Sequence, residues 1–247
     1  MDRMRPTRCP NCEYPLAADH VYCASCGQQV IGEDSLGSFI THFLGDYFTF
    51  DSKIIRSLVP VVLKPGFLTN EFRIGRRARY IPPLRMFIFL SVLFFLVIGW
   101  SSSSNELTDS DQLQEQVFWD RFFGSVLPKM IFLFMPCMAL LTFLFHRRTK
   151  APLLIAFVAS MHFHAFVFLA FGVYGLISAL FRASGALAVN RWLITALCGY
   201  TLYYLWRSLK TIYQEPPLAN SLKFVGLLVV YLMLLIGASV FAVWVLS

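Results

Sequence analysis

Charged residues are scarce in this chain, at 14% of 247 residues, while 57% of the residues are hydrophobic. A soluble domain usually carries about a quarter charged residues. The surplus of apolar side chains therefore needs an environment other than water, which favours an integral membrane protein. The net charge is +7, but the basic residues gather at the ends of apolar runs rather than on one face of a domain. This placement argues against nucleic acid as a partner.

Acidic residues are missing from every long apolar run, since all 14 lie between or before these runs. Proton-coupled pumps and intramembrane aspartyl enzymes depend on acids within the membrane. The chain also lacks the Gly-x-Ser-x-Gly, His-Glu-x-x-His and phosphate-loop patterns that mark common hydrolases and nucleotide-binding proteins. We therefore expect a protein that is not an enzyme and has no catalytic residues.

A secretory signal is also missing, because no apolar core precedes about residue 36. We therefore expect residues 1–32 to stay in a reducing cytosol. Two Cys-x-x-Cys pairs lie in this segment, separated by ten residues, and their members are Cys9, Cys12, Cys23 and Cys26. Four thiolates can close around Zn²⁺ as a tetrahedron with no open position. The pattern predicts a structural zinc ribbon, here called the ribbon.

Two other interpretations of the cysteine site stay open. Iron in a rubredoxin-like site is chemically reasonable. Two disulfides would need an oxidising compartment, which the expected cytosolic location excludes. His20 could replace one ligand, although a solvated turn residue is the simpler role. Gly27 suits the turn after the second knuckle, and Glu13 occupies the corresponding place in the first knuckle. We expect Glu13 to make that turn less favourable.

Residues 33–83 form an amphipathic segment of the predicted cytoplasmic part. Residues 36–48 follow the apolar spacing of one helical face, and 54–63 are too short to span a bilayer. These stretches either lie in the headgroup plane or pack on the membrane helices. The segment 64–85, here called the hinge, carries one acid and six basic residues that could bind anionic headgroups, namely Lys64, Arg73, Arg76, Arg77, Arg79 and Arg85.

The remaining residues, 84–247, are predicted to form a transmembrane helical bundle, which makes the fold an all-α integral membrane protein with a small N-terminal zinc ribbon. About five spans are expected, at 84–100, 122–145, 152–181, 187–206 and 224–246. The third of these, 152–181, is long enough to tilt in the membrane, or to break near Gly172 and Gly175.

The orientation follows from the positions of the charges. Basic residues concentrate in 1–85, 146–150 and 207–223, whereas 101–121 carries five acidic residues. The positive-inside rule then places the N-terminus inside and the C-terminus outside a bacterial inner membrane. The lipid bilayer is thus the expected partner, and a homo-oligomer and a cytosolic protein bound through the ribbon stay open.

His162 and His164 are an ionisable pair at mid-membrane depth in the third span. Residues two apart on a helix point about 200° from one another, so these rings cannot chelate one metal. One ring could hydrogen-bond to a backbone carbonyl or to Ser160 one turn earlier. Intramembrane histidines serve either as helix–helix contacts or as part of a transport pathway.

Taken together, the motifs resemble a bacterial family of uncharacterised membrane proteins. The resemblance rests on Cys26-Gly27-Gln28, on Lys64-Pro65-Gly66, on the run from Gly75 to Pro83, and on Met161-His162-Phe163-His164. It implies a two-knuckle ribbon ahead of several hydrophobic helices, and it names no activity.

The sequence thus favours a membrane scaffold that binds anionic lipid or a partner. The alternative is a transporter or channel for an ion or small solute, with a cavity near His162 and His164.

Overall fold

The computed structural model describes residues 6–17, 19–30, 53–103, 127–183 and 187–246. Within these ranges the chain forms seven α-helices and one short 3-10 helix, with two isolated β-bridges in the ribbon and no strand. The predicted amphipathic stretch 36–48 and most of the acidic segment 101–121 lie outside the described residues. The predicted all-helical fold with a four-cysteine cluster is confirmed in this part of the chain.

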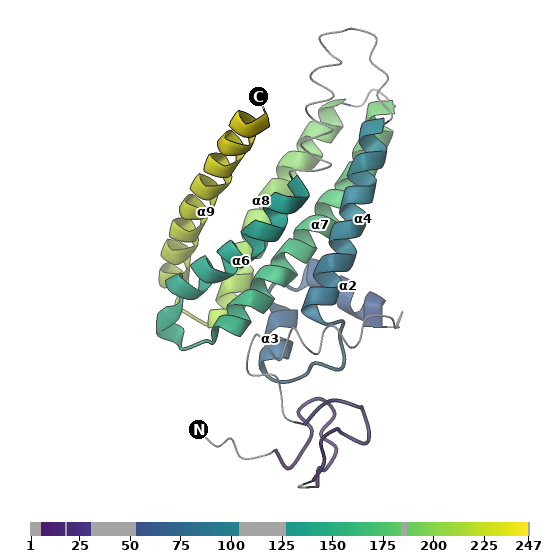
Figure 1. Cartoon of the computed structure of the whole chain (residues 1–247), viewed down its shortest axis with the longest axis vertical. Helices are drawn as coiled ribbons and strands as arrows, with labels where there is room; N and C mark the ends of the chain where they lie inside the picture. The colour runs from purple at the N-terminus through teal and green to yellow at the C-terminus, as the bar shows by residue number, and fades with distance from the viewer. Residues whose placement is uncertain (1–5, 18, 31–52, 104–126, 184–186, 247) are drawn as a thin grey trace.

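Five long helices correspond to the five predicted spans and run beside one another (Figure 1). They are α4 (Pro83–Ser103), α6 (Leu127–Phe145), α7 (Leu153–Ala183), α8 (Leu187–Tyr213) and α9 (Pro217–Leu246). Among the described residues, three stretches are long and apolar enough to cross a membrane, and they lie in α4, α7 and α9. This is consistent with a membrane protein, whereas membrane crossing by α6 and α8 stays a prediction.

Helix α7 is the centre of the bundle, since α4, α6 and α8 all pack against it. It runs without a break through Gly172 and Gly175, where a break had been the alternative to a tilt. A Cβ atom at Gly175 would lie 3.4 Å from Val97 of α4, and one at Gly172 would lie 3.7 Å from Phe94. The glycines therefore let α4 approach α7 closely, as small residues do between membrane helices.

Two short helices precede the bundle and pack against one of its ends (Figure 1). They are α2 (Lys53–Leu63) and α3 (Phe67–Arg73), and both contact α7. The rest of the hinge then leads into α4, which begins at Pro83, one residue before the predicted span. A proline suits this position because it lacks only an N–H that would be unpaired anyway. The ribbon lies beyond α3, next to the hinge.

Candidate functional site

The two knuckles of the ribbon share one backbone pattern, repeated after 14 residues. The amide of Glu13 donates to the carbonyl of Cys9 at 2.8 Å, and the amide of Gly27 donates to that of Cys23 at 2.9 Å. Both turn residues are left-handed, with φ of 63° at Glu13 and 70° at Gly27. Since this conformation costs a residue with a Cβ roughly 1–2 kcal/mol, the first turn is the less favourable one, as expected.

The four cysteine sulfurs converge, all within 4.8 Å of one another, so that they could hold a metal ion. The sulfurs of Cys9 and Cys26 are 3.7 Å apart, and those of Cys12 and Cys23 are 3.6 Å apart. All four are free thiols, since a disulfide would need about 2.05 Å. A tetrahedral ion with metal–sulfur bonds of about 2.3 Å would separate its sulfurs by about 3.8 Å.

The thiols differ in their affinity for protons. Burial raises the pKa of Cys9 to about 12. Burial also raises the pKa of Cys26, but hydrogen bonds from the Gln28 backbone, the Asn11 side chain and neighbouring thiols outweigh it and lower that pKa to about 7. Because a metal binds the thiolate, loading the site must release protons, and affinity for metal must fall as the pH falls.

A single side chain joins the ribbon to the hinge. Gln28 is buried, its amide nitrogen donates to the carbonyl of Gly75, and its amide oxygen accepts from the backbone amides of Arg77 and Ala78, each at 3.1 Å. Pro10 of the first knuckle packs closely on Gly75, since a Cβ atom added to Gly75 would lie 3.1 Å from the Cβ atom of Pro10. Both knuckles therefore contact the same loop of the hinge.

Several predicted headgroup ligands instead contact the protein. Arg73 donates to the carbonyl of Ile212, at the end of α8, at 3.0 Å. The guanidinium of Arg76 lies 3.3 Å from the carboxylate of Glu71, whose side chain is only 7% exposed. Arg85 is half-buried in the first turn of α4. Arg76 thus neutralises a buried acid and Arg73 the C-terminus of α8, which reduces the charge that these two residues can offer to a lipid.

Of the other basic residues of the hinge, one contacts the protein and two are exposed. The guanidinium of Arg77 lies 4.3 Å from the ring centroid of Phe72, a cation–π contact. The ammonium of Lys64 is exposed and lies 5.4 Å from the ring of Phe67. Arg79 is exposed. The structure therefore does not gather the six predicted residues into one site.

The histidines of α7 point to different neighbours, as their spacing predicts. His162 is buried, and its Nδ1 is 2.8 Å from the hydroxyl of Thr69 in α3. His164 is also buried, and its Nδ1 donates to the carbonyl of Ser160 at 2.8 Å. Its Nε2 then accepts from the hydroxyl of Tyr231 in α9, at 3.2 Å. These contacts link α7 to α3 on one side and to α9 on the other.

His164 lies beside the first turns of α4, at the hinge end of that helix, while its depth in a membrane stays a prediction. The ring of His164 packs edge-on against Phe87, 6.3 Å between centroids. Phe87 is about 6 Å along the axis from Pro83, where α4 begins, and about 24 Å from Ser103, where it ends.

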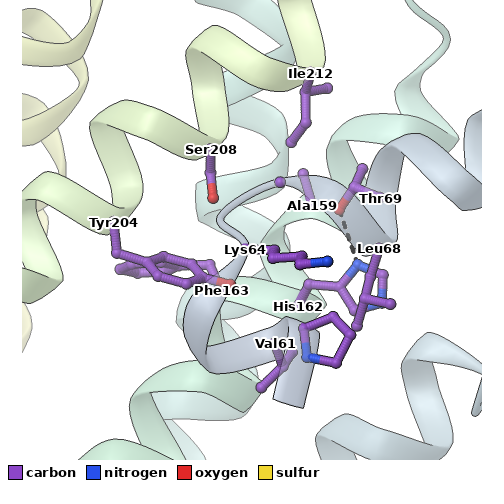
Figure 2. A pocket seen from close by; sticks show the side chains of 12 residues that line it. Val61, Lys64, Leu68, Thr69, Ala159, His162, Phe163, Tyr204, Ser208 and Ile212 are labelled. Atoms are coloured by element: carbon purple, nitrogen blue, oxygen red, sulfur yellow. Dashed lines mark hydrogen bonds between the residues drawn. The ribbon is translucent and has the colours of Figure 1, made fainter. Parts of the chain in front are cut away.

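A small pocket beside His162 opens between α2, α3, α7 and α8 (Figure 2). Its polar lining includes Lys64, Thr69, Tyr204 and Ser208. The space that the centre of a water molecule can occupy is about 10 Å³. A single water needs about 10–15 Å³ by this measure. The pocket therefore has room for about one water, and a larger solute would require the helices to move.

A second polar cluster was missed in the sequence. His146 lies just after α6, fully buried and stacked on Tyr213, with ring centroids 4.0 Å apart. Its Nδ1 is 3.0 Å from the carbonyl of Thr142, and its Nε2 is 3.7 Å from a carboxylate oxygen of Glu215. The other oxygen of Glu215 pairs with the ammonium of Lys223. This cluster holds the ends of α6, α8 and α9 together.

Burial lowers the pKa of His146, against smaller opposing effects of the Thr142 carbonyl and of Glu215. The ring is therefore neutral at neutral pH. No signal in the sequence marks this residue, because it stands at the end of an apolar run, directly before two arginines.

Comparison with known proteins gives one match. A family model described as "Protein of unknown function (DUF3667)" matches residues 51–95, which include α2, α3, the hinge and the first part of α4. The match leaves the ribbon untested and names no activity. No curated protein matches the chain, and no solved structure matches it.

Proposed function

We propose that this chain is a non-enzymatic integral membrane scaffold whose zinc-loaded ribbon is held on the hinge at the cytosolic face of the inner membrane. The observation that carries the proposal is the set of three hydrogen bonds between the Gln28 side chain and the backbone of the hinge. Through them the folding of a metal site is coupled to the entrance of the first membrane helix. The metal thereby sets the conformation of a membrane-bound surface.

Zinc is the metal that suits this site best. Four thiolates form a closed tetrahedron, which is typical of structural zinc and leaves no position for a substrate. A unit of about 30 residues is too small to fold on its own core, so binding of the metal would supply its folding free energy. Loss of zinc would then unfold the ribbon and free the hinge loop.

Two kinds of ligand fit such a scaffold. Anionic lipid would bind the exposed basic residues, of which Lys64, Arg73 and Arg79 lie in the hinge. A cytosolic protein would bind the ribbon, where Tyr14, Val21 and Tyr22 are exposed at 44%, 57% and 58%. Exposed aromatic side chains are enriched at protein interfaces.

The test is to measure metal content and tryptic cleavage of the full chain in lipid nanodiscs. We expect one zinc per chain and slow cleavage after the hinge arginines. Chelation, or the Cys26→Ser substitution, should accelerate that cleavage, because the docked ribbon is lost. The matched control is Cys198→Ser, which changes an exposed cysteine of α8. A chain without bound metal, or cleavage that is insensitive to chelation, would refute the proposal.

The alternative function, a transporter or channel near His162 and His164, has less support. The pocket beside His162 has room for about one water, and both rings are engaged in helix–helix contacts. Flux of an ion or solute through liposomes that is altered by His162→Ala would favour this alternative over the scaffold.

A further inference from the structure

Helix α2 has two distinct faces. Ser57 and Val61 are buried against the bundle. Ile55, Val59 and Leu63 are 74%, 52% and 67% exposed. Because residues four apart on a helix share a face, these three side chains form one apolar stripe that points away from the protein. Such a stripe on a helix of a soluble domain would face the core.

Helix α2 is fixed at two points, in its middle and in its last turn, where the bundle begins. The hydroxyl of Ser57 accepts from the backbone amide of Ile81 at 2.9 Å, and Ile81 lies two residues before the start of α4. The hydroxyl of Tyr200 in α8 donates to the carbonyl of Val62 at 2.7 Å. The outer stripe is therefore held beside the first residues of the candidate span that starts at Pro83.

The charges of α2 suit an anionic surface. The helix has no acidic residue, and Arg56 is exposed next to the apolar stripe. Lys53 begins the helix and Lys64 follows its last residue. In contrast to Arg73 and Arg76 of the hinge, which contact the protein, Arg56 projects from the same side as the stripe.

We propose that the outer face of α2 is a membrane-binding surface, which lies in the headgroup plane of the anionic leaflet with its apolar stripe towards the acyl chains. An amphipathic helix with a basic polar part binds anionic bilayers in this orientation. The inference rests on the proposed function only in assigning the hinge end to the cytosolic leaflet. It adds lipid contacts at Ile55, Arg56, Val59 and Leu63 of α2 to those proposed for the exposed basic residues of the hinge.

Photo-crosslinking of the full chain tests the contact. A photoreactive phenylalanine analogue replaces Val59 in nanodiscs of phosphatidylcholine with phosphatidylglycerol, and the same analogue replaces Val21 of the ribbon as a control of similar exposure. We expect lipid adducts at position 59, detected by mass spectrometry, and none at position 21. Adducts to a second copy or to another protein at position 59, or equal lipid adducts at both positions, would overturn the proposal.

The charge is tested by Arg56→Gln, with Arg8→Gln of the ribbon as the matched control, since both arginines are exposed. One basic residue near an anionic surface corresponds to about a fivefold change in lipid affinity. We expect Arg56→Gln to lower the retention of phosphatidylglycerol about fivefold in native mass spectrometry, and Arg8→Gln to leave it unchanged. Equal retention in the two variants would contradict the charge assignment.

These readouts separate this proposal from the scaffold function. Chelation should leave the crosslinks at position 59 intact, because α2 is fixed by Ile81 and Tyr200 and not by the ribbon. Crosslinks that disappear on chelation would refute an independent surface on α2. If only the test of metal content and cleavage failed, the proposed contact between α2 and lipid would be unaffected.

Discussion

Replacing Gln28 by alanine should release the hinge loop. The substitution removes the partner of the Gly75 carbonyl and of the Arg77 and Ala78 amides. Each hydrogen bond contributes about 1 kcal/mol net, and water can reach part of this loop, so we expect a loss of about 1–3 kcal/mol in local stability. This loss corresponds to roughly 5- to 140-fold faster opening, at about 1.4 kcal/mol per tenfold change.

Hydrogen exchange with mass spectrometry measures this opening directly. In zinc-loaded nanodiscs, a peptide that covers residues 74–80 should exchange faster in Gln28→Ala by that factor. The control is Gln29→Ala, the neighbouring half-buried glutamine. Exchange of this peptide at the wild-type rate in Gln28→Ala would refute the coupling of ribbon and hinge.

Three further predictions concern single residues. Replacing Glu13 by glycine should stabilise the ribbon by about 1 kcal/mol, since the backbone φ is 63° at this residue. The concentration of chelator that removes half of the metal should then rise. An unchanged concentration would contradict backbone strain at Glu13. Gly66→Ala should destabilise the chain by more than about 1 kcal/mol, because φ is 77° and the new Cβ would lie 2.8 Å from the carbonyl oxygen of Ser208. Gly199→Ala, where nothing lies within 4 Å, should not lower the melting temperature. Because the pKa of His146 in the folded chain is lowered below its usual 6.5, its contribution to stability is complete above that pH and is lost as the pH falls further. His146→Gln should flatten this part of the pH profile of thermal stability, and an unaltered profile would refute a neutral buried ring.

The local features of the fold could be predicted from the sequence. The spacing of Cys9, Cys12, Cys23 and Cys26 alone predicts that they form one cluster, because the two ligands of each pair in such a metal site lie only a few residues apart in the sequence. The helical segments follow from apolar runs, and the start of α4 follows from Pro83. In these cases the cause of the structure lies within one short segment.

The contacts that join segments could not be predicted in this way. Gln28 and Gly75 are 47 residues apart, and Arg73 and Ile212 are 139 apart. Nothing in the composition of the hinge says that Arg76 pairs with a buried acid. Glu71 was visible as the only acid of the hinge, but only packing shows that its side chain is buried.

The central claim is that bound metal holds the ribbon on the hinge. Pulsed electron paramagnetic resonance measures it most directly, with spin-labelled unnatural side chains at Val21 of the ribbon and at Arg148, both exposed. In the zinc-loaded chain in nanodiscs, we predict a narrow distance distribution that broadens when the metal is removed. A distribution that is broad with zinc bound, or one that stays narrow after its removal, would contradict the claim.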